Sequence, residues 1–209
     1  MKKDINMKEK EKFMKKDLRD KINKLIKNTK AKSIGSITLY KGNFITLIQE
    51  DYVLPNGVIM PRERIIKNHN KPAVVIVAKD ESGKYLLVVQ NRVQGITSVE
   101  FPAGYVEPGE EIIDAAAREL REETGYVSDE LEILDSYNTS LGIDGSMVYI
   151  VTANHCVKLY DQDLDENEFI NYDLFTFDEL KELVENNYVN GAGNKLAYYE
   201  ILNKKGKTK

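Results

Sequence analysis

The chain has 209 residues, of which 42% are hydrophobic and 31% charged, with one cysteine and a net charge of −4. This composition fits one globular domain with an appendage or a short second domain. Its apolar runs are too short to cross a bilayer, residues 1–30 lack the apolar core of a secretory signal, and the lone Cys156 excludes an internal disulfide. We therefore expect a cytoplasmic protein without membrane contacts, in which Cys156 is a small buried strand residue.

Residues 1–32 form a basic extension. They carry thirteen Lys or Arg against five Asp or Glu, an excess of +8, so the other 177 residues carry −12. Apolar residues at helical spacing predict an amphipathic helix from about Glu9 to Lys27; they are Met14, Leu18, Ile22 and Leu25. The extension is interpreted as a solvated helix. Contact with nucleic acid or an anionic surface is the alternative, although the acidic body argues against a large nucleic-acid footprint.

Residues 33–70 predict a small antiparallel sheet. Segments 36–40 and 44–50 surround a Lys-Gly-Asn turn, and segments 52–54 and 57–60 flank Pro55-Asn56-Gly57. Segment 62–67 continues as another strand. We expect these residues to form a β-strand subdomain of their own.

Residues 71–209 predict a larger domain of mixed elements. Its expected strands are 73–78, 85–90, 148–153 and 169–175, the first two joined as a hairpin, and its expected helices are 110–123, 177–185 and 193–202. These elements lack the regular βαβ repeat of a parallel sheet. We therefore expect an α+β fold, a mixed sheet covered by helices on both faces.

Three carboxylates in the predicted helix 110–123 point to a metal site. Glu119, Glu122 and Glu123 are spaced three and four residues apart and share one helix face. Such like charges destabilise a bare helix by roughly 0.2–0.5 kcal/mol per pair. A hard divalent cation with oxygen ligands turns this repulsion into joint attraction.

The surrounding segment resembles a known family. Gly104, five residues, Glu110, seven residues and then the run Arg118 to Gly125 match the Nudix box, G-x5-E-x7-R-E-U-x-E-E-x-G-U, with Tyr126 as the one departure in its last position. The resemblance implies an α/β/α sandwich of the Nudix type. It also implies that Glu119, Glu122 and Glu123 bind Mg²⁺ or Mn²⁺, that the Ala103 carbonyl completes the metal sphere, and that Arg118, paired with Glu110, orients a helix carboxylate.

The chemistry follows from these parts. Metal ions neutralise pyrophosphate oxygens and lower the pKa of bound water for in-line attack. No Ser-His-Asp or Cys-His arrangement is needed. His69 and His155 lack metal-ligand spacing, and we interpret both as structural or surface residues.

The flanks of the box resemble the ADP-ribose pyrophosphatase group over roughly residues 37 to 202. The matching segments include LYKGNF, PNGVIMPRERI, VVQNRV, ITSVEFPAGYVEPGE and Leu164 to Glu168. The resemblance implies that Arg92 and Arg64 contact the substrate phosphate or ribose, and that Phe44 stacks on the base, in some relatives from the partner subunit. It further implies that Glu166 or Glu168 deprotonates the attacking water or helps to hold metal, and that the subdomain 33–70 forms a homodimer.

One departure from the pattern of this group leaves the identity of the substrate open. Where ADP-ribose-specific members carry a proline followed by an acidic residue, this chain has Leu141 and Ser146, and Asp144 is either a replacement or a turn residue. We expect hydrolysis of a nucleoside diphosphate sugar, with ADP-ribose favoured, to a nucleoside monophosphate and a sugar phosphate. GDP-mannose or another nucleoside diphosphate derivative is one alternative, and a non-catalytic nucleotide-binding module is another.

Overall fold

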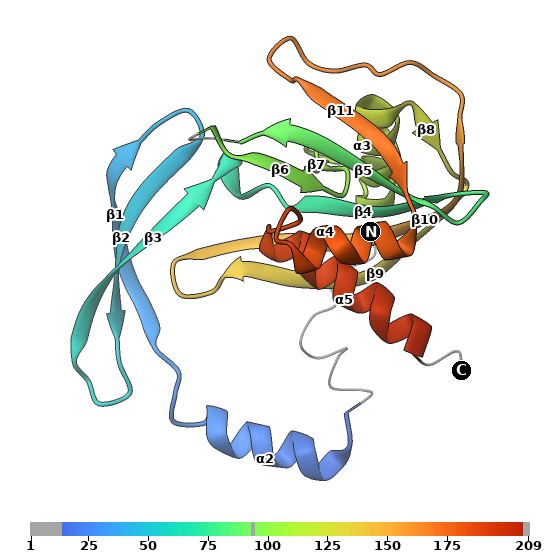
Figure 1. The fold of residues 1–209 in the computed structure, drawn as a ribbon. Helices are drawn as coiled ribbons and strands as arrows, with labels where there is room; N and C mark the ends of the chain where they lie inside the picture. The colour runs from blue at the N-terminus through green and yellow to red at the C-terminus, as the bar shows by residue number, and fades with distance from the viewer. Residues whose placement is uncertain (1–13, 93–94, 207–209) are drawn as a thin grey trace. The chain divides into compact units, whose positions relative to one another are not determined.

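A computed structural model describes residues 14–92 and 95–206, and the chain forms two compact units that divide between His69 and Asn70. The described elements of the first unit (Figure 1) are α2 (Lys16–Ile26), β1 (Lys32–Lys41), β2 (Ile45–Val53) and β3 (Ile59–Lys67). The three strands pair antiparallel in the order β1, β2, β3. Two segments expected as separate strands form one strand, β3, because its pairing with β2 continues through Pro61 opposite Asp51. The beginning of the predicted amphipathic helix lies outside the described residues.

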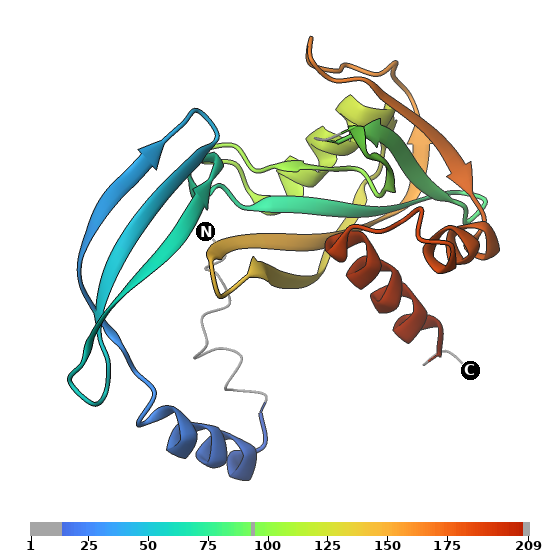
Figure 2. The ribbon, with the colours of Figure 1, turned by 60° about the vertical axis from the view of Figure 1, so that its left-hand side comes forward.

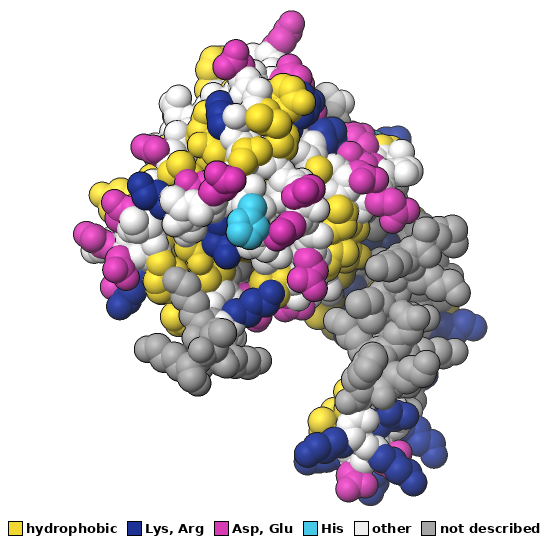
Figure 3. Space-filling view, turned by 90° about the vertical axis from the view of Figure 1, so that its right-hand side faces the viewer, with side chains coloured by type: hydrophobic (Ala, Val, Ile, Leu, Met, Phe, Trp, Pro, Cys, Tyr) yellow, Lys and Arg dark blue, Asp and Glu magenta, His cyan; other side chains and the backbone are white. Residues whose placement is uncertain are grey.

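The sheet of this unit buries little of its apolar surface. Every residue of β1 is exposed, and Ile48 is the only buried residue among residues 14–69. A single layer of three strands cannot by itself shield its faces from solvent. In Figure 3, Lys and Arg side chains predominate on α2, at the bottom of the view, while Asp and Glu side chains are spread over the larger unit. The charge asymmetry of the sequence is thus visible on the surface.

The second unit is a mixed sheet with helices. Its strands are β4 (Ala73–Asp80), β5 (Tyr85–Asn91), β6 (Thr97–Glu100), β7 (Ala103–Tyr105), β8 (Tyr126–Val127), β9 (Glu130–Ser140), β10 (Asp144–Lys158) and β11 (Ile170–Phe175). Its helices are α3 (Ile112–Thr124), α4 (Phe177–Glu185) and α5 (Ala192–Gly206), with a short 3-10 turn, η2 (Asn68–Asn70), at the division between the units.

The pairing of these strands is both parallel and antiparallel. β10 runs parallel to β4 and antiparallel to β9 and, at its end, to β8. The expected hairpin of β4 and β5 is bonded only at its turn, where Lys79 lies opposite Tyr85. Beyond that point β4 pairs with β7, and β5 pairs with β6 and β11. The two strands therefore diverge beyond the turn.

Alternate residues of β4 belong to two separate hydrophobic cores. Val74, Ile76 and Ala78 pack with residues of α3, whereas Val75 and Val77 pack with residues of α4 and α5. Successive side chains of a strand point to opposite faces, so a strand buried on both sides is apolar throughout. Figures 1 and 2 show α3 on one face of this sheet and α4 with α5 on the other. The α/β/α arrangement expected from the sequence is confirmed.

The boundaries of α3 follow local chemistry. Gly125, with a φ of 71°, ends the helix in the left-handed conformation that a residue with a Cβ rarely adopts, and its N–H bonds to the Arg121 carbonyl. The helix begins two residues later than expected, at Ile112 and not at Glu110.

No helix of the described ranges 14–92 and 95–206 is long and apolar enough to cross a membrane.

Candidate active site

Helix α3 carries the acidic face that the sequence predicted. Glu119 and Glu123 lie one turn apart on it; Glu123 is 4% exposed, and the side chains of Glu119 and Glu122 are 15% and 27% exposed. Carboxylates are rarely buried unless they are paired or coordinate a cation. The chain thus places three carboxylates where solvent stabilises them poorly.

Arg118 is the local counter-charge of this cluster. Its guanidinium donates five hydrogen bonds. Nε donates to Glu110 Oε1 at 2.9 Å, and Nη1 donates to Glu119 Oε1 at 2.8 Å and Glu122 Oε2 at 2.9 Å. Nη2 donates to Glu110 Oε2 at 3.1 Å and to the Tyr105 carbonyl at 2.9 Å. The expected ion pair with Glu110 is present, and it lowers the pKa of that carboxyl. Arg118 therefore joins the loop before α3 to two of the three helix carboxylates.

Glu123 lies deepest and depends on different partners. Its Oε2 accepts a bond from the Ala103 N–H at 3.0 Å. Burial, together with the charges of Glu119 and Glu168, raises the pKa of Glu123 to about 8 against the lowering effects of the Ala103 amide and Arg92. Burial also raises the pKa of Glu119, with contributions from Glu122 and Glu168. Burial therefore disfavours the charged form of both carboxyls, and Arg118 beside Glu119 and Arg92 near Glu123 offset this effect only in part.

Gly104 lies directly against this cluster. Strand β7 holds it opposite Val74 of β4, next to Ala103. A Cβ at position 104 would overlap the carboxylate of Glu119, well inside the 3.0 Å that real Cβ atoms keep. Gly104 thus approaches Glu119 so closely that no space is left for a larger residue.

The donor set fits a hard divalent cation. Glu119, Glu122 and Glu123 offer only oxygen atoms, which Mg²⁺ and Mn²⁺ prefer. The raised pKa values of Glu119 and Glu123 indicate the need for a further positive charge. Within residues 14–92 and 95–206, no group of three such side chains already converges as a metal sphere, and Arg118 holds Glu119 and Glu122 instead.

The loop before β11 contains the two candidates for a general base. The Glu168 N–H donates to the Asp165 carbonyl at 2.9 Å, and Glu168 Oε2 accepts from the Asp165 N–H at 3.3 Å. Glu168, and not Glu166, is among the charges that raise the pKa values of Glu119 and Glu123. Its position favours Glu168 over Glu166, and the role of either residue stays a prediction.

Arg92 follows β5 and is held by a carboxylate that the sequence did not single out. Its Nε and Nη2 donate to the two oxygens of Glu100 at 2.7 and 2.5 Å. Burial alone would raise the pKa of Glu100, but hydrogen bonds from Arg92, Ser98 and Asn194 outweigh it and lower the pKa. About half of the Arg92 side chain remains exposed. It therefore has a fixed orientation and room for a further anionic partner.

Phe44 and Arg64 belong to the other compact unit. The Phe44 side chain is half exposed. Arg64 Nε donates to Glu50 Oε2 at 2.8 Å, and hydrogen bonds from Ser33 and Arg64 lower the pKa of Glu50 to about 2. Their expected contacts with substrate stay predictions.

Asp144 accepts hydrogen bonds that define a turn. Its Oδ1 accepts from the N–H and hydroxyl of Ser146 at 2.9 and 2.6 Å, and its Oδ2 accepts from Thr139 at 2.7 Å. Leu141, at the turn, is 81% exposed. Of the two interpretations left open, the geometry favours a turn residue over a substitute carboxylate.

The remaining single residues have structural surroundings. His155 is exposed near Glu130, where a φ of 51° accompanies a bulge in β10. Cys156 is buried, and burial raises the pKa of its thiol to about 11. Asn194 of α5 was missed, because its Oδ1 accepts from the Phe101 N–H, 93 residues away, and no local pattern signals that contact.

Comparisons with known proteins agree with this geometry. The NUDIX domain model matches residues 69–192. The chain is 37% identical over 175 residues to the ADP-ribose pyrophosphatase of Bacillus subtilis (strain 168), covering 83% of this chain and 92% of that protein. It is 33% identical to the methanol dehydrogenase activator of Bacillus methanolicus, covering 74% of this chain and 83% of that protein. The crystal structure of an ADP compounds hydrolase is similar with a TM-score of 0.76 at 26% identity, covering 85% of this chain and 96% of that chain.

Proposed function

The chain belongs to the Nudix family, as the match over residues 69–192 shows, and we propose that it hydrolyses the pyrophosphate bond of a nucleoside diphosphate sugar, with ADP-ribose as the favoured substrate. The products are a nucleoside monophosphate and a sugar phosphate. The names of the relatives support an ADP-linked substrate. This chain matches both an ADP-ribose pyrophosphatase and an ADP compounds hydrolase over most of their length.

The buried carboxylate cluster beside Gly104 carries this proposal. A divalent cation held by Glu119, Glu122 and Glu123, with the Ala103 carbonyl as a further ligand, would neutralise pyrophosphate oxygens and activate water. Mg²⁺ is the proposed ion and Mn²⁺ the alternative. Arg118 keeps Glu119 and Glu122 in place through its hydrogen bonds.

Side chains around the cluster supply the remaining roles. Glu168 accepts the proton of the attacking water in this scheme, because its charge already acts on Glu119 and Glu123. Glu166 is the alternative base. Arg92, oriented by Glu100, contacts a substrate phosphate, and Arg64 and Phe44 contribute contacts to phosphate and base.

The subdomain at residues 33–70 is the proposed dimer contact. Its sheet exposes apolar side chains of β1 and β3, including Ile37 and Ile59, both 59% exposed. Contiguous exposed apolar surface is typical of an interface. Sedimentation at micromolar concentration checks the homodimer, and a monomer at that concentration would contradict it.

A substrate panel tests the proposed activity. ADP-ribose, GDP-mannose, NADH and diadenosine polyphosphates are incubated side by side with Mg²⁺, Mn²⁺ or EDTA, and the products are separated by chromatography. We expect metal-dependent release of a nucleoside monophosphate, fastest from ADP-ribose. Faster turnover of GDP-mannose would select that alternative instead, which the exposed Leu141 leaves open.

Matched variants test whether turnover depends on the carboxylates of the metal site or on the negative charge of the protein in general. Glu119→Gln and Glu123→Gln remove one charge each from the cluster, and Glu132→Gln removes one from the exposed surface of β9. Losing metal-bound carboxylates should abolish turnover in the first two and leave the third unchanged. Bound nucleotide without turnover in the wild-type protein would favour a binding module.

A further inference from the structure

The carboxyl end of α3 is capped by a segment from elsewhere in the chain. A helix leaves its last four carbonyls without partners inside the helix. Here the first of them, at Arg121, accepts from Gly125, and the next three accept from residues 158–163, which we call the capping segment. The donors are Asp163 N–H to Glu122 at 2.9 Å, Gln162 Nε2 to Glu123 at 2.6 Å and Lys158 Nζ to Thr124 at 2.8 Å.

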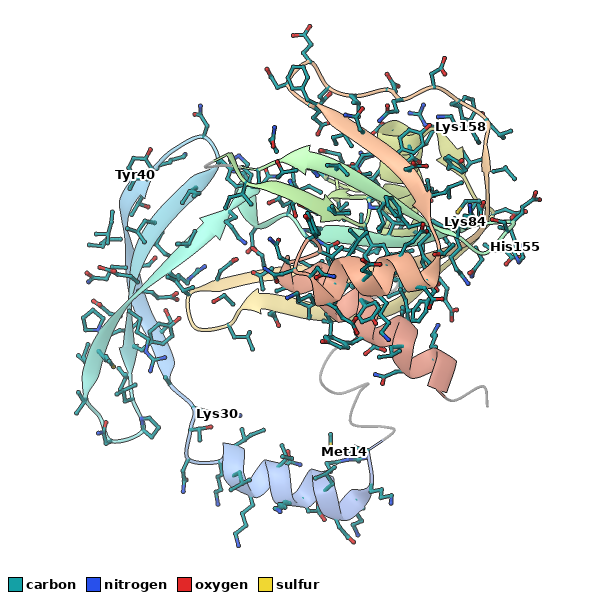
Figure 4. The ribbon with its side chains drawn as sticks, in the orientation of Figure 1. Met14, Lys30, Tyr40, Lys84, His155 and Lys158 are labelled. Atoms are coloured by element: carbon teal, nitrogen blue, oxygen red, sulfur yellow. The ribbon has the colours of Figure 1, made fainter. Side chains whose placement is uncertain are left out.

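The capping segment connects two parts of the candidate site. Its start is fixed by Lys158, at the end of β10 (Figure 4), which also bonds the Tyr172 hydroxyl and lies 4.6 Å from the centre of that ring. Its end leads into the loop 163–169, which holds both candidate bases. The carbonyls that it caps belong to the turn of α3 that carries Glu122 and Glu123.

Gln162 makes the central contact. Its single Nε2 donates to the Glu123 carbonyl at 2.6 Å and to the Ile170 carbonyl at 3.1 Å. Ile170 is the first residue of β11. The half-buried amide of Gln162 therefore connects α3 to Ile170, which follows the loop. The N–H of the neighbouring Asp163, which begins the loop, bonds the Glu122 carbonyl of the same helix.

The chemistry of this contact requires an amide. An NH₂ group has two hydrogens, and the two carbonyls are its two acceptors. A glutamate in this place has oxygens alone and would repel both carbonyls, although its size is the same. An alanine leaves both without this donor.

We propose that Gln162 is a positioning residue, which sets the loop 163–169 so that Glu168 faces Glu119 and Glu123. This inference rests on the proposed function, in which Glu168 accepts the proton of water. The loop's own contacts between Asp165 and Glu168 are local and exposed, so they shape the turn without fixing it to the helix. Asp163 connects the start of the loop to α3 through its N–H to Glu122 and its carboxylate to Arg121 at 3.6 Å. The Gln162 amide adds the connection at the far end, because it bonds the Ile170 carbonyl as well as that of Glu123.

Kinetics of two variants at this position test the role of Gln162. For Gln162→Ala at saturating Mg²⁺ we expect kcat for ADP-ribose to fall roughly 10- to 100-fold with little change in KM, since misplacing a catalytic group by about 1 Å can cost about 10²-fold. Gln162→Glu, which keeps the size of the side chain, should show a similar loss and replaces the alanine variant should that variant not fold.

A double substitution distinguishes positioning from general damage. If Gln162 acts through Glu168, the variant with Gln162→Ala and Glu168→Gln together is no slower than Glu168→Gln alone. Additive losses would overturn the proposal. Asn186→Ala is the matched control, because the Asn186 amide donates to the Glu182 carbonyl at 2.9 Å at the end of α4, a helix that carries none of the proposed site residues. It should keep the wild-type kcat.

Hydrogen exchange gives a readout that does not depend on activity. In EDTA-treated protein, amides of residues 163–169 should exchange faster in Gln162→Ala than in the wild type, while those in the middle of α3 stay protected. Unchanged exchange in the loop, or faster exchange with a normal kcat, would overturn the inference. A wild-type protein inactive on every substrate would refute the proposed function, and the exchange result would then still decide whether Gln162 holds the loop.

Discussion

Gly104→Ala should lower activity strongly while leaving the protein folded. The backbone at Gly104 is not in the left-handed region, so alanine meets no conformational strain there. Its Cβ would overlap the carboxylate of Glu119, the flexible end of a side chain, which must withdraw by roughly 1 Å or more. A shift of that size in a catalytic group costs about 10²-fold in rate. We therefore expect kcat/KM for ADP-ribose to fall by about two orders of magnitude.

The assay compares this variant with a glycine that has space around it. At Gly142 an added Cβ meets nothing within 4 Å, so Gly142→Ala should keep wild-type kinetics. Thermal unfolding of both variants should stay within a few degrees of the wild type, because the Glu119 carboxylate is the end of a flexible side chain and can withdraw without moving the backbone. A Gly104→Ala protein with near wild-type kcat/KM, or one that unfolds far earlier, would refute the reasoning.

Three further predictions concern the charged groups of the site. In Arg118→Lys, the single ammonium group cannot span Glu110, Glu119 and Glu122, so this variant should have a much lower kcat and a fold destabilised by about 2 kcal/mol. This loss is smaller than for a fully buried ion pair, because Arg118 is partly exposed. A melting temperature and a kcat equal to those of the wild type would contradict this prediction. Because burial raises the pKa of Glu123 from 4.5 to about 8, its contribution to stability is present below pH 4.5 and is lost as pH rises to 8. In EDTA, the free energy of unfolding should fall across that range in the wild type but not in Glu123→Gln, as denaturant titrations at several pH values will measure. Glu100→Gln should raise KM for ADP-ribose several-fold at unchanged kcat, because it weakens the contact that orients Arg92. Initial-rate kinetics of this variant and of Arg92→Ala will check the prediction. An unchanged KM would count against a substrate contact at Arg92.

Local spacing made the acidic face of α3 predictable from the sequence. Glu119, Glu122 and Glu123 share a face because of helical geometry alone, and Gly125 ends the helix because of its own backbone. The apolar runs of β4 and β5 likewise indicate strands buried on both sides. In each case the residues that determine the structure are neighbours in the sequence.

The missed features depend on contacts between distant residues. Strand β9 was not expected, because none of its residues is buried and its partly buried positions do not alternate, and it forms by pairing with β10. The pairing of Arg92 with Glu100 depends on β5 and β6 lying side by side. The sequence also could not separate Glu166 from Glu168, since both lie in one acidic loop and only the turn at Asp165 gives them different positions.

The contacts of Arg118 argue that a cation serves the chemistry of this site more than its folding. One guanidinium already bonds Glu110, Glu119 and Glu122, and the buried Glu123 carries a raised pKa that favours its neutral form below about pH 8. Arginine pairing and protonation thus limit the repulsion among four carboxyls without an ion. A structural metal site, by contrast, provides much of the folding energy. EDTA-treated protein should therefore unfold cooperatively, with Mg²⁺ raising its stability only as far as binding to the folded state requires.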